Sequence, residues 1–176
     1  MAGELRNREP VEGLVVPLLP GHIGSWDELF LGICELVARK SKDPSTQTGC
    51  VVVDRDLRIR STGFNGFPRG VPDDPAWYAD RDKKLALIAH CDANAVYSAA
   101  RTGTSLSGCT MYLTAPPCSE CCKAITQAGI VEVVYPLDNQ FDRDPARRAR
   151  WAESFENARI LLDGAGVKVR KWSPEK

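Results

Sequence analysis

The chain has 176 residues, of which 43% are hydrophobic and 26% charged, enough for one domain with its own core. Lysine plus arginine and aspartate plus glutamate number 23 each, so the zero net charge gives no general attraction to nucleic acid. No apolar run is long enough to cross a bilayer, and no secretory signal pattern is present. The seven cysteines are therefore expected to be reduced thiols in a cytoplasmic protein that binds neither membrane nor nucleic acid.

Residues 1–24 contain three prolines and four glycines, and this composition predicts an irregular arm. Residues 25–176 are expected to form a single domain, because no linker, internal repeat or low-complexity tract divides them. The domain should open with a helix, since Ser25 and Glu28 have the spacing of a capping box. Apolar residues at helical spacing extend this helix to about Lys40.

The next two segments predict a β-hairpin. Residues 49–54 and 59–64 have the composition of strands, and a short turn joins them. Residues 65–75 form a loop dense in glycine and proline, and a long loop within a compact domain is usually functional or disordered. Residues 85–101, rich in alanine and leucine, predict one continuous helix.

The second half of the chain alternates between strands and helices. We predict strands at 109–114, 130–135 and 167–172, and helices at 118–129 and 145–166. Strand–helix alternation after an opening hairpin favours an α/β fold in three layers, with helices on both faces of a mixed sheet of about five strands.

Cys118 and Cys121 have C-x-x-C spacing in the first turn of a predicted helix, where both sulfurs can face one point. Such a pair, taken alone, is also compatible with a redox motif or with two buried thiols. Zinc prefers thiolate and imidazole ligands, and the chain offers two histidines, His22 in the arm and His90 near the start of a helix. One histidine and two cysteines would leave a fourth position for water, as in catalytic zinc sites.

The segments "HCDANA" and "PCSEC" together resemble the H-x-E…P-C-x-x-C signature of zinc-dependent nucleotide deaminases. The segments "SKDPSTQTG", "GFNGFPRG" and "MYLTAPPCSEC" make the chain most similar to the deoxycytidylate (dCMP) deaminases. The resemblance extends from about Trp26 to Tyr135. It implies the cytidine deaminase-like version of the three-layer fold.

This resemblance implies hydrolysis of dCMP to dUMP with release of ammonia. It also implies a zinc ion held by His90, Cys118 and Cys121, which activates the attacking water. In the family, a glutamate two positions after the histidine transfers the protons, and Asp92 occupies that position here.

The aspartate is the largest departure from the family pattern, because its carboxylate lies about 1.5 Å further back on a shorter side chain. A misplacement of about 1 Å can cost on the order of 100-fold in rate. Three interpretations stay open. The helix can lie closer to the metal and restore the geometry; the enzyme can be slow, or act on a related base such as a 5-substituted one; or the protein can bind zinc and nucleotide without turnover.

Five further positions are candidates for substrate contact. By resemblance, Asn65 touches the sugar and base, although its local sequence also suits a left-handed turn residue. Ala115 and Pro116 can present backbone groups to the base. Lys42 and Arg69 flank the motifs and are candidate phosphate contacts, with surface charges as the alternative.

The remaining cysteines are expected to be structural. Cys34, Cys50 and Cys109 should lie in the core, and Cys122 should point away from the metal. Cys91 can pack as a small apolar residue, with competition for the metal as the alternative.

Assembly and regulation follow from the resemblance alone. Family members commonly form homohexamers, and they bind dCTP with Mg²⁺ as an activator and dTTP as an inhibitor. The arginine-rich run at 147–150 is expected on a solvated helix face, with a subunit contact as the alternative.

Overall fold

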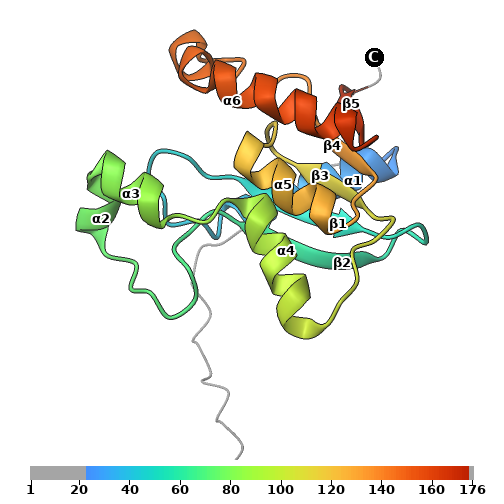
Figure 1. Ribbon diagram of the computed structural model, residues 1–176, viewed down its shortest axis with the longest axis horizontal. Coiled ribbons are helices and arrows are strands. Elements are labelled where there is room, and N and C mark those ends of the chain that lie inside the picture. The colour runs from blue at the N-terminus through green and yellow to red at the C-terminus, as the bar shows by residue number, and fades with distance from the viewer. Residues whose placement is uncertain (1–22, 175–176) are drawn as a thin grey trace, which may run out of the picture.

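The computed structural model describes residues 23–174 and contains one five-stranded sheet with helices on both faces (Figure 1). Its strands are β1 Gly49–Val53, β2 Ile59–Phe64, β3 Thr110–Leu113, β4 Glu132–Pro136 and β5 Lys168–Trp172. Its helices are α1 Trp26–Ala38, α2 Pro75–Ala79, α3 Arg81–Leu87, α4 Cys91–Thr102, α5 Ser119–Gln127 and α6 Pro145–Gly164. The predicted arm lies almost wholly outside the described residues, as does His22.

The sheet is mixed, as predicted. Its strand order is β2-β1-β3-β4-β5, with β1 antiparallel to both of its neighbours and β3, β4 and β5 parallel. Helices α5 and α6 form the crossovers between the parallel strands, the usual way to join parallel neighbours. The predicted hairpin is confirmed, since β1 and β2 pair from Gly49 with Phe64 to Val53 with Ile59.

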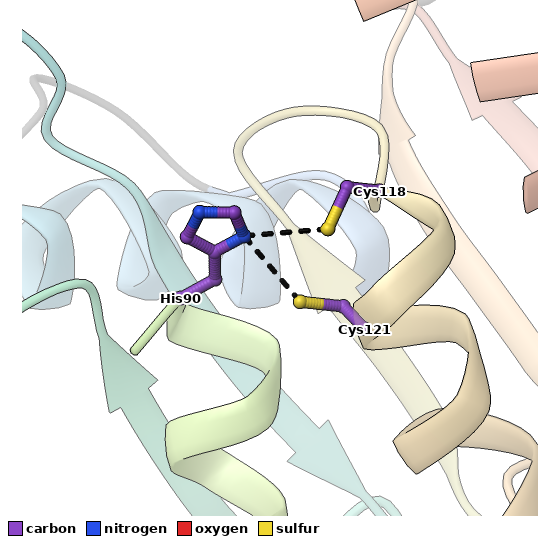
Figure 2. Close-up of side chains that lie close together, drawn as sticks. All are labelled: His90, Cys118 and Cys121. Carbon is purple, nitrogen blue, oxygen red and sulfur yellow. Dashed lines mark hydrogen bonds between the residues drawn. The ribbon is translucent and has the colours of Figure 1, made fainter. Parts of the chain in front are cut away.

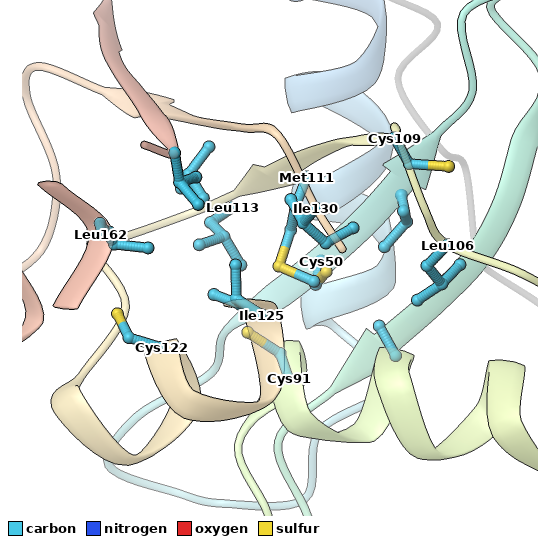
Figure 3. Packing of buried hydrophobic residues seen from close by; sticks show 14 of the residues in the cluster. Cys50, Cys91, Leu106, Cys109, Met111, Leu113, Cys122, Ile125, Ile130 and Leu162 are labelled. Carbon is cyan, nitrogen blue, oxygen red and sulfur yellow. The ribbon is translucent and has the colours of Figure 1, made fainter. Parts of the chain in front are cut away.

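The core lies on both sides of the sheet because alternate strand residues face opposite ways. On one side, Val51 and Val53 of β1 pack against Phe30 of α1. On the other side, a larger cluster joins the strands to α4, α5 and α6; Figure 3 shows Cys50, Met111 and Ile125 within it. The predicted three-layer α/β/α architecture is confirmed.

Helix α1 begins at the predicted N-cap. The Ser25 hydroxyl accepts a hydrogen bond from the Glu28 N–H at 3.1 Å. The Glu28 carboxylate reaches back to the N–H of Gly24 at 3.0 Å, one residue earlier than in a standard capping box. Within residues 23–174, no helix has the length and apolar composition of a membrane span.

The continuous helix predicted for 85–101 is wrong. The structure has α3 and α4 in its place, separated by a short extended stretch. Ala89 breaks the helix because it pairs with Gly66, and the two residues exchange backbone hydrogen bonds of 3.0 Å in each direction. This bridge holds His90 in an extended conformation at the N-cap of α4. Tertiary pairing thus overrides the helix propensity of the segment.

Helix α4 is held very close to β2 by a glycine. A Cβ atom on Gly63 would lie 2.0 Å from the carbonyl oxygen of Cys91 and 2.6 Å from the backbone nitrogen of Ala95. Backbone atoms cannot move aside as a flexible side chain can, so this position requires glycine. The contact sets the height of α4, and with it His90, above the sheet.

Gly63→Ala is therefore expected to lower the free energy of unfolding by about 1–3 kcal/mol or more, the range typical of overpacking. Gly32→Ala is the matched control, because Gly32 lies within α1 and its Cβ would meet nothing within 4 Å. The control should gain about 0.5–1 kcal/mol from better helix propensity. Urea unfolding curves measure both changes, and equal stability of the two variants would contradict the packing argument.

Candidate active site

The structure brings His90, Cys118 and Cys121 together, the three residues predicted to hold a metal. The Nδ1 atom of His90 lies 3.4 Å from Sγ of Cys118 and 3.5 Å from Sγ of Cys121 (Figure 2). All three ligand atoms lie within 4.8 Å of one another. Among residues 23–174 no fourth ligand-type side chain joins this group.

Two helix N-termini converge on the cluster. His90 is the N-cap of α4 and Cys118 is the N-cap of α5, and both have extended backbones. Neither side chain caps its own helix, so both are directed to the cluster. Cys121 follows within the first turn of α5. Helix N-termini carry partial positive charge, which favours thiolates at this point.

The spacing of the three atoms suits a zinc ion. In a tetrahedral site, with Zn–S of about 2.3 Å and Zn–N of about 2.0 Å, a nitrogen and a sulfur ligand are separated by about 3.5 Å. The two observed N–S separations match this value. The donor set therefore fits zinc with three protein ligands and one open position, which is the pattern of a catalytic site.

The cluster also favours an ionised sulfur. Hydrogen bonds with Cys121 and with the His90 ring lower the pKa of Cys118. The same contact with Cys118 raises the pKa of His90. Cys118 is thus the thiol that loses its proton first, as a metal ligand must.

Asp92 lies beside the cluster in the first turn of α4, with 3% of its surface exposed. Its Oδ1 accepts a hydrogen bond from the N–H of Ala93 at 3.0 Å. Burial raises the pKa of Asp92, and the neighbouring Cys118 raises it further. A carboxyl with a raised pKa near a reacting centre is suited to proton transfer.

Asp92, His90 and Cys118 line one cavity of about 80 Å³, which we call the inner cavity. Three of the predicted substrate contacts, Asn65, Ala115 and Pro116, also line it. The other two predicted contacts, Lys42 and Arg69, do not line the inner cavity. Lys42 pairs with Asp73 at 2.7 Å, and Lys42 and Arg69 line a different cavity beside the 65–71 loop. Neither predicted phosphate contact therefore reaches the cluster in this structure.

Asn65 is buried, with 2% exposed, and its amide is largely occupied by the protein. Its side-chain oxygen accepts from the N–H of Thr48 at 2.8 Å, and its NH₂ group donates to the carbonyl of Thr46 at 2.5 Å. Asn65 therefore fixes one wall of the inner cavity and keeps one acceptor lone pair for a ligand. The alternative of a left-handed turn residue is wrong, because among residues 23–174 only Leu57 combines a side chain with positive φ.

The sequence argument missed the aromatic wall contributed by α6 and the loop before it. The Trp151 ring lies 5.9 Å from the His90 ring, and Phe141 and Phe155 stand edge to face at 5.3 Å. All three line the inner cavity. The signal was the spacing of Trp151 and Phe155, which lie four residues apart and so on one face of the helix.

The other cysteines are structural, as expected. Cys34, Cys50 and Cys109 are buried in the core, and all seven cysteines of the chain are free thiols. Cys91 and Cys122 are buried in the large cluster of Figure 3 and lie outside the metal-ligand group. Competition of Cys91 for the metal therefore finds no support.

Comparison with known families identifies what this cluster resembles. The profile described as "Cytidine and deoxycytidylate deaminase zinc-binding region" matches residues 24–137, which include all three clustered residues. Deoxycytidylate deaminase of Pongo abelii is 37% identical over 155 residues, covering 85% of this chain and 81% of the relative. The Homo sapiens protein of the same name is 36% identical with the same coverage.

A solved structure shares the fold. The dCMP deaminase of cyanophage S-TIM5, in complex with dCMP and dUMP, superposes with a TM-score of 0.64. It is 23% identical in sequence, and the match covers 86% of this chain and all of the phage chain.

Proposed function

The chain belongs to the cytidine and deoxycytidylate deaminase family, and from this premise we propose that it hydrolyses dCMP to dUMP and ammonia. One observation carries the proposal: a His/Cys/Cys cluster with zinc spacing adjoins a buried carboxyl in the same cavity. The choice of dCMP is supported by curated relatives named deoxycytidylate deaminases, which match over most of their length.

His90, Cys118 and Cys121 would hold the zinc ion. Bound zinc supplies Lewis acidity, which makes a water molecule nucleophilic near neutral pH. Asp92 acts as the proton carrier of the hydrolysis. Its carboxylate takes one proton from the water and delivers it to N3 of the cytosine ring. It then takes the remaining proton from the hydroxyl added at C4 and passes it to the amine, so that ammonia leaves as the C4 carbonyl forms.

The walls of the inner cavity orient the base. Ala115 and Pro116 precede the cysteine ligands, so their backbone groups can bind an edge of the ring. Asn65 offers its remaining acceptor lone pair to the base or sugar. The Trp151 ring lines the same cavity near His90 and limits access of bulk water to the reacting carbon.

Purified protein with zinc is expected to release equal amounts of dUMP and ammonia from dCMP. Deoxycytidine should react far more slowly, because it lacks the phosphate that contributes binding energy. Chromatography of the nucleotides, with a coupled ammonia assay, measures both. Absence of dUMP with zinc bound would contradict the proposed activity, and preference for free deoxycytidine would contradict the proposed substrate.

The proposal extends to assembly, regulation and location. A homo-oligomer, hexameric by family resemblance, is supported by exposed apolar residues such as Tyr97 on α4 and Ile160 on α6. Regulation by dCTP with Mg²⁺ and by dTTP rests on family resemblance alone. A cytoplasmic location is supported by the seven free cysteines.

A further inference from the structure

A second cavity of about 370 Å³ adjoins the inner cavity, and we call it the outer cavity. The two cavities lie side by side, because they share five lining residues: Thr46, Lys84, Leu85, Phe141 and Trp151. Sites for small-molecule ligands usually measure about 300–1,000 Å³. The inner cavity at about 80 Å³ is too small for a whole nucleotide, so part of the substrate must occupy adjoining space.

Every charged residue in the lining of the outer cavity is a cation. Arg81 and Lys84 come from α3, and Arg147 and Arg150 come from α6. The chain as a whole has no net charge, so this concentration is local. A cavity with four cations and no lining carboxylate is suited to an anion such as phosphate.

Two of these cations are held in place by the protein. Lys84 is 12% exposed; its Nζ lies 3.2 Å from Asp43 Oδ1 and 2.5 Å from Ser45 Oγ. Arg147 donates to Gln140 at 2.7 Å and to the carbonyl of Ser45 at 3.2 Å. Its Nε also lies 3.8 Å from Asp144 Oδ2.

The other two are less restrained. Arg81 approaches the exposed Asp82 at 3.8 Å. The side chain of Arg150 forms no hydrogen bond or ion pair within residues 23–174, so its guanidinium keeps its full donor capacity. Arg150 directly precedes Trp151, which lines both cavities. One turn of α6 therefore contributes residues to the inner cavity and to the outer cavity.

We propose that the outer cavity binds the 5′-phosphate of the substrate, with Arg150 and Lys84 in direct contact and Arg147 as a positioning residue. This inference rests on the proposed function and deepens it, since it explains how the site selects a nucleoside monophosphate over a nucleoside. The base occupies the inner cavity beside His90, and the phosphate lies among the cations of α3 and α6. These residues take the role that the sequence had suggested for Lys42 and Arg69.

Arg150→Ala is expected to lower kcat/KM for dCMP by about 10- to 100-fold, mainly through KM, because a charged hydrogen bond to the phosphate is lost. Turnover of deoxycytidine should change less than twofold, and Arg150→Lys should recover part of the loss. The matched control is Arg148→Ala, because Arg148 pairs with Asp142 and lines a different cavity. The control should keep the wild-type KM for dCMP.

Calorimetric titration with dUMP and with deoxyuridine tests the inference independently of turnover. Arg150→Ala should weaken dUMP binding by a similar factor and leave deoxyuridine binding unchanged. If the wild type binds dUMP in this way but makes no dUMP from dCMP, the proposed function fails and the phosphate site stands. Unchanged dUMP affinity in Arg150→Ala overturns the inference, and so does a change confined to the response to dCTP, which would make the cavity an effector site.

Discussion

Asp92→Asn is expected to lower kcat for dUMP formation by about 100- to 10,000-fold, the range for loss of a general acid–base. The amide is nearly isosteric with the carboxyl but cannot accept the proton of the attacking water. Asp92 is not in the metal-ligand group, so the variant should bind zinc as the wild type does. Steady-state kinetics and metal analysis of the same preparation measure both effects.

The Asp92→Glu variant distinguishes between the interpretations of having aspartate at a position where the family has glutamate. If α4 already brings the Asp92 carboxylate to the reacting water, the added methylene overfills a small cavity and the rate falls. Activity that appears only in the glutamate variant would instead identify a zinc- and nucleotide-binding protein whose Asp92 carboxyl does not reach the reacting water. Asp56→Asn, in the turn of the hairpin, is the control and should keep full activity. Full activity of Asp92→Asn would refute the role of Asp92.

Cys118→Ser is expected to remove zinc from the protein and to abolish dUMP formation. Loss of a group that merely supports a metal ligand typically costs about 10- to 100-fold in affinity, so loss of the ligand itself should cost at least about 100-fold. Metal content after exhaustive dialysis measures the effect. The fold should persist, because Cys118 lies at the start of a helix and outside the large core cluster.

Cys34→Ser is the matched control for this experiment. Cys34 is equally buried, but its Sγ donates to the carbonyl of Tyr112 on the opposite face of the sheet. Serine can replace that donor, so the variant should keep zinc and activity with a modest loss of stability. Equal zinc loss in both variants would show that the metal depends on the fold in general and not on Cys118.

The sheet and the metal cluster were predictable because their signals are local. Buried strands such as β1 carry continuous apolar runs, and Cys118 and Cys121 are fixed relative to each other by a single helical turn. His90 was identified by its motif, but its extended N-cap conformation was not. That conformation depends on the bridge between Ala89 and Gly66, a contact between segments more than twenty residues apart.

The rest of the cavity could not be read from the sequence, because distant elements supply it. Trp151 and Arg150 belong to a helix outside the motifs, α6, which packs against α5; Trp151 lines the inner cavity and Arg150 lines the outer one. Lys42 and Arg69 lie near the motifs in sequence yet face another cavity. Motif spacing thus predicted which side chains cluster as candidate metal ligands, but it did not indicate which charged residues line the cavities around them.

The most direct test of the account is to remove metal from the purified protein with a chelator and to titrate zinc back while measuring dUMP formed from dCMP. We predict that activity disappears on chelation and returns in proportion to zinc, reaching its maximum at one ion per chain. Undiminished activity in the metal-free protein, or no dUMP at full zinc occupancy, would contradict the claim that His90, Cys118 and Cys121 form the catalytic centre of a dCMP deaminase.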